Sequence, residues 1–170
     1  MWLLNVDTYA LEEFATSELP RYAILSHTWG KEEVSFRDMT QCPLDDIRPK
    51  AGFRKIELTC RQAKDNALKY AWVDTCCIDK SSSAELSDAI NSMFQWYQSA
   101  NICYAYVSDF EGVNVEDLSF YKSCWWQRGW TLQVGMSGLL CTISSLQNLA
   151  TGTDSTQHCS LFQQTLGFIG

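Results

Sequence analysis

Residues 51–76 read AGFRKIELTCRQAKDNALKYAWVDTC, and they join a helix pattern to a strand pattern. Small and apolar residues recur at steps of three and four, which places them on one face of a helix over residues 51–69: Phe53, Ile56, Cys60, Ala63 and Ala67. The opposite face carries charged side chains: Arg54, Lys55, Glu57, Arg61, Lys64 and Asp65. The run YAWVDTC at 70–76 is short and rich in apolar and aromatic residues, which predicts a buried strand after the helix.

Two further runs have the character of that strand, YAILSH at 22–27 and ICYAYV at 102–107. Runs that lack polar alternation are typical of parallel strands covered on both faces. Between the second and third runs, Ser82 and Glu85 have the spacing of a capping box. An apolar stripe follows and predicts a second amphipathic helix, formed by Leu86, Ile90, Met93 and Tyr97.

The order strand, helix, strand, helix, strand predicts an α/β fold. Right-handed crossovers would place the helices against a parallel sheet. The connection over residues 28–50 is long for such a fold, so we expect it to hold a functional loop or a short extra element.

The composition limits the kinds of protein that this chain can be. A length of 170 residues with 46% hydrophobic residues indicates one globular domain. The formal net charge of −7 argues against a nucleic-acid partner. No apolar run reaches the length of a bilayer span, and the start, MWLLNVDTYALEEF, lacks a basic leader region. We therefore expect a cytoplasmic protein that does not associate with membranes.

The eight cysteines are scattered, no CxxC occurs, and His27 and His158 are the two histidines of the chain. This pattern predicts buried reduced thiols and no metal site.

Polar residues follow each predicted strand, where ligands bind in open parallel sheets. The candidate pocket contains Ser26, His27, Trp29, Asp74, Cys77 and Asp79, with Glu85, Arg128 and Trp130 as further candidates. Trp29 could stack on a base or a nicotinamide ring, and Asp74 or Asp79 could hold ribose hydroxyls. The amides of residues 81–83 could meet a phosphate.

Each of these residues also has a structural interpretation. His27 could be a structural hydrogen-bonding group, Trp29 a cap on the core and Asp74 a cap on the next turn. Glu85 fits a capping box as well as a catalytic role. Cys77 is either a nucleophile near His27 or a buried thiol.

Residues 123–133, SCWWQRGWTLQ, carry three tryptophans and one arginine. We expect Trp125 and Trp126 to anchor a helix start on the sheet edge. Arg128 and Trp130 are equally compatible with such an anchor and with the pocket.

Four segments together resemble the HET (heterokaryon incompatibility) domain of filamentous fungi: YAILSHTWG, GFRKIELTCRQAKDNALKYAWVDTCCIDK, SSAELSDAINSMFQWYQSANICYAYVSD and SCWWQRGWTLQ. The resemblance covers about Tyr22 to Gln133. It implies a role in non-self recognition, in which contact between incompatible individuals triggers programmed cell death. HET domains also resemble TIR domains distantly, which implies a flavodoxin-like three-layer fold. The same relation implies NAD as a substrate, cleaved at its nicotinamide-ribose bond, and no resident cofactor.

The resemblance also locates a departure from the family. Its usual Trp-Thr-Leu-Gln-Glu, similar in spacing to a TIR helix with a catalytic glutamate, here ends in Val134. Valine offers neither charge nor hydrogen bond, so the resemblance implies an inactive or severely impaired chain. We expect a HET domain over 1–133, shortened at its C-terminal end. Residues 134–170 form a low-charge tail whose one formal charge is Asp154. They read equally as a genuine tail or as a gene-model or splicing artefact.

Three functions are therefore compatible with the sequence. The first is a NAD-hydrolysing effector of incompatibility that is degenerate at Val134. The second is a non-catalytic adaptor that assembles with itself or with other HET-domain proteins. The third is a fragment without independent function.

Overall fold

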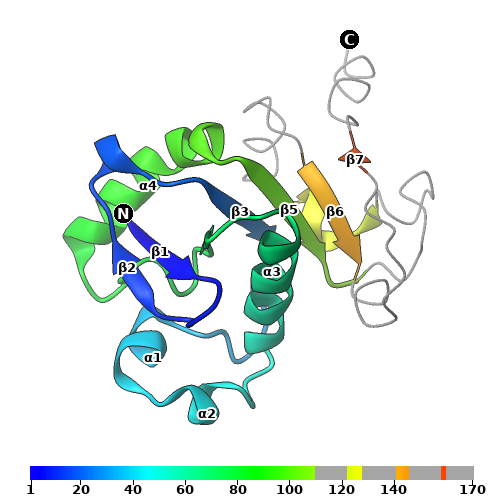
Figure 1. Ribbon diagram of the computed structural model, residues 1–170. Helices are drawn as coiled ribbons and strands as arrows, with labels where there is room; N and C mark the ends of the chain where they lie inside the picture. Colours follow the sequence, from blue (N-terminus) through cyan, green and yellow to red (C-terminus); the bar gives the residue numbers. More distant parts are fainter. Residues whose placement is uncertain (110–121, 128–140, 146–157, 160–170) are drawn as a thin grey trace.

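The computed structural model describes residues 1–109, 122–127, 141–145 and 158–159, and these form one mixed α/β unit (Figure 1). The described strands make a seven-stranded sheet in the order β2-β1-β4-β3-β5-β6-β7. Their bounds are Trp2–Asn5 for β1, Leu11–Glu13 for β2, Tyr22–His27 for β3, Tyr70–Trp72 for β4, Ile102–Val107 for β5, Cys141–Ser145 for β6 and His158–Cys159 for β7.

The centre of the sheet is parallel, as predicted, and its edges are antiparallel. Strands β4, β3, β5 and β6 run parallel to one another. At one edge β1 pairs antiparallel with both β2 and β4, and at the other β7 pairs antiparallel with β6. The three predicted strands are therefore parallel as expected, while the sheet as a whole is mixed. The N-terminal hairpin of β1 and β2 was not expected, and it joins the sheet by burying Leu3 and Leu4 completely.

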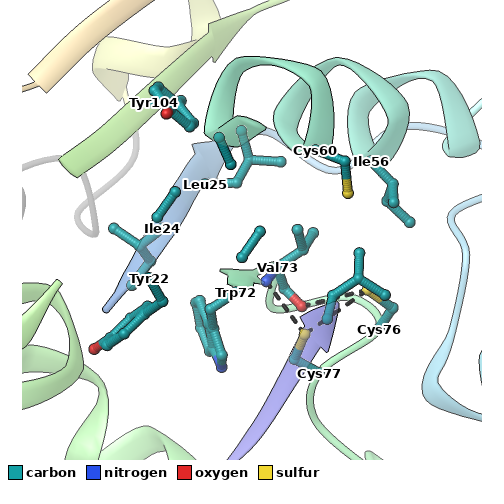
Figure 2. Close-up of a cluster of buried hydrophobic side chains, with 14 of the residues drawn as sticks. Tyr22, Ile24, Leu25, Ile56, Cys60, Trp72, Val73, Cys76, Cys77 and Tyr104 are labelled. Carbon is teal, nitrogen blue, oxygen red and sulfur yellow. Dashed lines mark hydrogen bonds between the residues drawn. The ribbon is translucent and has the colours of Figure 1, made fainter. Parts of the chain in front are cut away.

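Helices cover both faces of the sheet. Their bounds are Thr16–Glu18 for η1, Phe36–Gln41 for α1, Leu44–Ile47 for α2, Phe53–Asp65 for α3, Ser83–Ser99 for α4 and Cys124–Gln127 for η3. Figure 2 shows Ile56 and Cys60 of α3 on one side of the sheet, while Tyr22 and Trp72 point to the other. There the Tyr22 hydroxyl donates to the Trp96 carbonyl of α4. No helix among the described residues is both long and apolar enough to cross a membrane.

Helix α3 is shorter at both ends than the predicted helix over 51–69. It ends at Asp65, and Ala67 lies beyond it with a φ of 55°, in the left-handed region. The amide of Leu68 then donates to the Ala63 carbonyl at 2.8 Å. This C-terminal turn reverses the chain into β4, so Ala67 does not belong to the helical face that its spacing predicted.

The sequence predicted a strand that continues to Cys76, but β4 ends at Trp72. The Val73 carbonyl accepts hydrogen bonds from the amides of Cys76 at 3.2 Å and Cys77 at 2.8 Å, which closes a tight turn. Figure 2 shows both sulfurs of this turn beside Val73. A backbone committed to that turn cannot continue the ladder.

Six cysteines have described side chains, and all six are free. Four are buried, as predicted: Cys60, Cys76, Cys77 and Cys103. Burial raises the pKa of Cys60 to about 12, so this thiol stays protonated. The other two, Cys42 and Cys124, are exposed, which contradicts the expectation for them.

Helix α4 begins as predicted, with the Ser82 hydroxyl accepting from the Glu85 amide at 3.3 Å. The Glu85 carboxylate does not close the capping box, because it accepts from the Asp79 amide at 3.0 Å. The connection over 28–50 holds the short helices α1 and α2, so it contains extra elements as expected. The residues 134–170, where the sequence indicated no element, contribute β6 and β7.

Gly52 allows the start of α3 to approach the loop before α1. A Cβ atom at Gly52 would lie 2.8 Å from the Glu32 carbonyl oxygen and 2.8 Å from the Glu33 Cα. We expect Gly52→Ala to lower the free energy of unfolding by about 1–3 kcal/mol, measured by urea denaturation, because backbone must shift to admit the methyl group.

Gly30→Ala is the matched control. A Cβ there would meet only the Glu33 Oε1 atom, at 3.6 Å, so its effect should stay within about 0.5 kcal/mol. Equal stability of the two variants would show that the close approach at Gly52 is absent.

Candidate functional site

A pocket of about 210 Å³ opens beyond the carboxyl end of β3. Three aromatic side chains, Trp29, Tyr97 and Trp125, line it, and we call it the ring pocket. Its other apolar residues are Leu25, Ile78, Leu86, Ile90 and Met93, and its polar residues are Ser26, His27, Asp74 and Lys80.

The sheet topology explains the position of the ring pocket. The chain passes from β3 through α3 to β4 on one side of β3, and then through α4 to β5 on the other side. At such a switch the loops diverge and leave a crevice at the carboxyl ends of the strands. Three of the predicted residues, Ser26, His27 and Trp29, reach the pocket from β3 and the loop after it.

Asp74, which follows β4, joins the ends of the two neighbouring strands. Its Oδ1 atom lies 2.7 Å from His27 Nε2, and its Oδ2 atom accepts from the Trp29 indole N–H at 2.7 Å. The carboxylate therefore fixes the imidazole and the indole together, and each of its oxygens has one of these two partners.

Lys55 approaches the other edge of the imidazole. Its ammonium donates to His27 Nδ1 at 3.0 Å and to the Thr28 carbonyl at 3.1 Å, and it forms an ion pair with Glu33. The Thr28 carbonyl oxygen also lies 3.2 Å from Nδ1, but it accepts from the same ammonium. An ammonium cannot accept a hydrogen bond, so Nδ1 is the acceptor and the imidazole N–H lies on Nε2, toward Asp74.

Our placement of Lys55 on the exposed face of its helix is wrong. The residue is only 7% exposed, because α3 is covered on this side by the loop that carries Glu33. The row formed by Lys55 and Thr59 therefore joins the buried face, and the Thr59 hydroxyl donates to the Lys55 carbonyl at 2.7 Å. A buried ammonium requires such a carboxylate partner.

The electrostatic environment keeps Asp74 ionised. Burial raises the pKa of this carboxyl, but the hydrogen bonds from His27 and Trp29 and the nearby charge of Lys80 outweigh burial, and the pKa falls below its ordinary value. The ammonium of Lys80 lies 3.8 Å from the centroid of the Trp29 ring. Burial lowers the pKa of Lys80, opposed by the charge of Asp74.

Trp125 closes the pocket on the side of β5. Its indole N–H donates to the Ser26 hydroxyl at 3.1 Å, and it is almost completely buried. The Asp109 carboxylate, just after β5, accepts from the Cys124 amide at 2.7 Å and so positions η3. The structure thus places Trp125 against β3 as an aromatic anchor.

The structure does not bring every predicted residue into the ring pocket. Cys77 lies in the core, where its sulfur accepts from the Val73 amide at 3.4 Å. Glu85 bonds to the Asp79 amide, and Asp79 lines an adjoining cavity instead. Arg128, Trp130 and Val134 lie outside the described residues. Within the described part of the chain, no three His, Cys, Asp or Glu side chains are grouped to hold a metal ion.

Several pocket residues were missed in the sequence. Lys80 lines the pocket and was not among the candidate residues, and neither was Glu33, which pairs with Lys55 outside the pocket. The apolar stripe of α4 was predicted as one face of an amphipathic helix and not as part of the pocket, and in it Leu86 and Met93 are only partly buried and Ile90 is 48% exposed. The four residues of this stripe form one wall of the ring pocket, and the available signal was the uninterrupted apolar row itself.

The pKa shift of Asp74 predicts a pH dependence of stability. Because its folded-state pKa is depressed, Asp74 stabilises the fold above its ordinary value of 3.8, and this contribution is lost as the pH falls through the folded-state pKa. Asp74→Asn should lower the free energy of unfolding by about 1–3 kcal/mol at neutral pH, because an amide offers one acceptor where two donors converge.

The difference between Asp74→Asn and the wild type should shrink when urea unfolding is repeated at about pH 3. Asp88→Asn, on the exposed surface of α4, is the control and should change little at either pH. A difference that does not depend on pH would contradict the assigned role of the Asp74 charge.

The chain matches a known family and a known fungal protein. The family model described as "Heterokaryon incompatibility protein (HET)" matches residues 22–119. Over 133 residues the chain is 46% identical to "Vegetative incompatibility protein HET-E-1" of Podospora anserina. This alignment covers 72% of the chain and 9% of that protein, so the chain spans a small part of its relative. No solved structure matches the chain significantly. More than half of the chain lies within the family match, and the chain belongs to the heterokaryon incompatibility (HET) family.

Proposed function

We propose that this HET domain binds NAD, with the nicotinamide and its ribose in the ring pocket, and that it acts in fungal non-self recognition leading to cell death. The observation that carries the proposal is the Trp29 indole, which Asp74 holds by its N–H at the rim of a pocket walled by two further aromatic rings. Few polar groups among apolar and aromatic walls are typical of sites for planar organic ligands.

The size of the ring pocket defines which part of the ligand it holds. Its 210 Å³ falls below the roughly 300–1,000 Å³ of sites that enclose a whole drug-sized molecule. A single ring with the beginning of its sugar fits this volume better than a complete dinucleotide does. The rest of NAD would therefore lie beyond the rim.

The order of the parallel strands supports the relation to TIR-like folds. Taken in chain order, the parallel strands β3, β4, β5 and β6 are arranged second, first, third and fourth across the sheet. The flavodoxin-like order begins in the same way, and its ligand lies between the first and third strands. The ring pocket lies at the corresponding place.

The pocket favours binding over cleavage in the chain as written. When nicotinamide leaves, positive charge develops on the ribose. A carboxylate whose oxygens do not already accept hydrogen bonds from the protein would stabilise that charge. Both oxygens of Asp74 already accept hydrogen bonds. The Oε1 atom of Glu33 accepts from the Lys55 ammonium, and the Oε1 atom of Glu85 accepts from the Asp79 amide. The family resemblance places the expected glutamate at Val134. We therefore propose that the chain holds NAD without efficient turnover.

The test compares binding with nicotinamide release. We expect the wild type to bind NAD in calorimetry without releasing nicotinamide, and Val134→Glu to release it, followed by chromatography. Val134→Gln is the matched control, because it has the size of glutamate without the charge. Trp29→Ala should weaken NAD binding by about fivefold to a hundredfold, since stacking on an aromatic ring contributes about 1–3 kcal/mol. Equal release by the Glu and Gln variants would refute the role assigned to position 134.

A non-catalytic assembly role is the second candidate, and the pocket rim favours it. Among the described residues, Trp29 and Ile90 are the large hydrophobic side chains that are exposed, at 49% and 48%, and both line the ring pocket. We propose a second HET domain as the partner on this rim.

Sedimentation over a range of concentrations tests this candidate. Ile90→Asp should weaken self-association of the wild-type protein, whereas Ser87→Asp, at another exposed position of α4, should leave it unchanged. A wild-type protein that stays monomeric at every concentration would exclude self-assembly through this rim.

A further inference from the structure

A second cavity adjoins the ring pocket and differs from it in chemistry. It has a volume of about 390 Å³, and we call it the Arg37 pocket. Ile78 and Lys80 line both cavities, so the two meet at these residues. Four hydroxyl side chains line the Arg37 pocket together with the Phe36 ring: Ser35, Thr40, Thr75 and Ser81.

Lys80 stands where the two cavities meet, with its charge only partly matched. Its ammonium lies over the Trp29 ring, and among the described residues it makes no hydrogen bond or ion pair. A ring face attracts the charge but does not satisfy three N–H donors. Donors at a cavity that no carboxylate pairs favour an anionic ligand.

Arg37 supplies a second cation to the same cavity. Its Nε–H donates to the Gln41 side chain at 2.8 Å, which uses one of five guanidinium donors. The fork of an arginine matches two oxygens of a phosphate at once. The chain as a whole has a net charge of −7 and repels anions. The two cations at this cavity therefore make it a more favourable place for an anion than the average surface of the chain.

We infer that the Arg37 pocket is a phosphate-binding subsite, in which Arg37 and Lys80 hold a phosphate group of a ligand whose ring lies in the ring pocket. The ligand class is thus a nucleotide with its phosphates beside α1. The orientation rests on the proposed function, whereas phosphate binding at Arg37 rests on the cavity alone.

Asp79 allows a test in which the expected change in phosphate affinity is opposite to that at Arg37. This carboxylate lines the Arg37 pocket and accepts from the Ser81 amide at 2.9 Å and the Ser81 hydroxyl at 2.6 Å. Its negative charge opposes a phosphate, and an asparagine could keep the same two hydrogen bonds through its Oδ1 atom. Removing the charge of Asp79 should therefore strengthen phosphate binding, whereas removing that of Arg37 should weaken it.

The experiment measures calorimetric binding of three probes: ADP-ribose, inorganic pyrophosphate and nicotinamide riboside, which lacks phosphate. We expect Arg37→Gln to weaken ADP-ribose and pyrophosphate about tenfold and to leave nicotinamide riboside unchanged. Lys64→Gln removes another exposed cation, one that pairs with Asp7 outside both cavities, and it should change none of the three. Asp79→Asn should bind both phosphate probes several-fold more tightly.

Two results would overturn the inference. One is a wild-type protein that binds neither phosphate probe; the other is an Arg37→Gln variant that binds all three probes as the wild type does. Loss of phosphate binding in Asp79→Asn would likewise contradict it, since Asp79 would then be a ligand-binding group. Failure of Val134→Glu to release nicotinamide bears on the proposed function alone, because pyrophosphate binding does not depend on cleavage.

Discussion

The Asp74 carboxylate is the constraint on which the candidate site depends. It follows β4 in the chain, yet it holds the imidazole at the end of β3 and the indole two residues later. Parallel neighbours bring these ends to the same edge of the sheet, so one carboxylate can organise two loops at once. The pocket wall at Trp29 and the contact of Lys80 with its ring both follow from this one placement.

Behind the imidazole, a row of hydrogen-bonded polar groups runs into the interior. Glu33 faces Lys55, Lys55 faces His27, and His27 faces Asp74. Burial of these charges costs free energy unless each has a partner of opposite charge or a hydrogen bond. The row also joins four separate segments, namely the loop before α1, helix α3, the end of β3 and the turn after β4. Gly52 admits this arrangement because any Cβ there would meet the backbone at Glu32 and Glu33. The rigidity of the site thus depends on packing distant from its opening.

Two chemically different cavities meet at Lys80 and Ile78. One offers aromatic walls and one offers hydroxyls and cations, as a ligand with a planar ring and a phosphate would require. The same topology that opens the crevice at the carboxyl ends of β3 and β5 also places α1 and the turn after β4 beside it. A nucleotide ligand is therefore favoured by the arrangement of the elements as well as by individual side chains.

The sequence by itself determined the α/β class, the strands over 22–27 and 102–107, the start of α4 at Ser82 and four pocket residues: Ser26, His27, Trp29 and Asp74. These depend on local periodicity and on the rule that strand ends converge, both of which are readable in a linear chain. Tertiary structure alone decided the antiparallel hairpin at the edge, the burial of Lys55, the exposure of the α4 stripe and the removal of Cys77 from the pocket. In each case the feature depends on a contact with a residue far away in the sequence, or on a turn of the backbone within a few residues. The spacing of apolar residues along a helix or strand predicts neither of these.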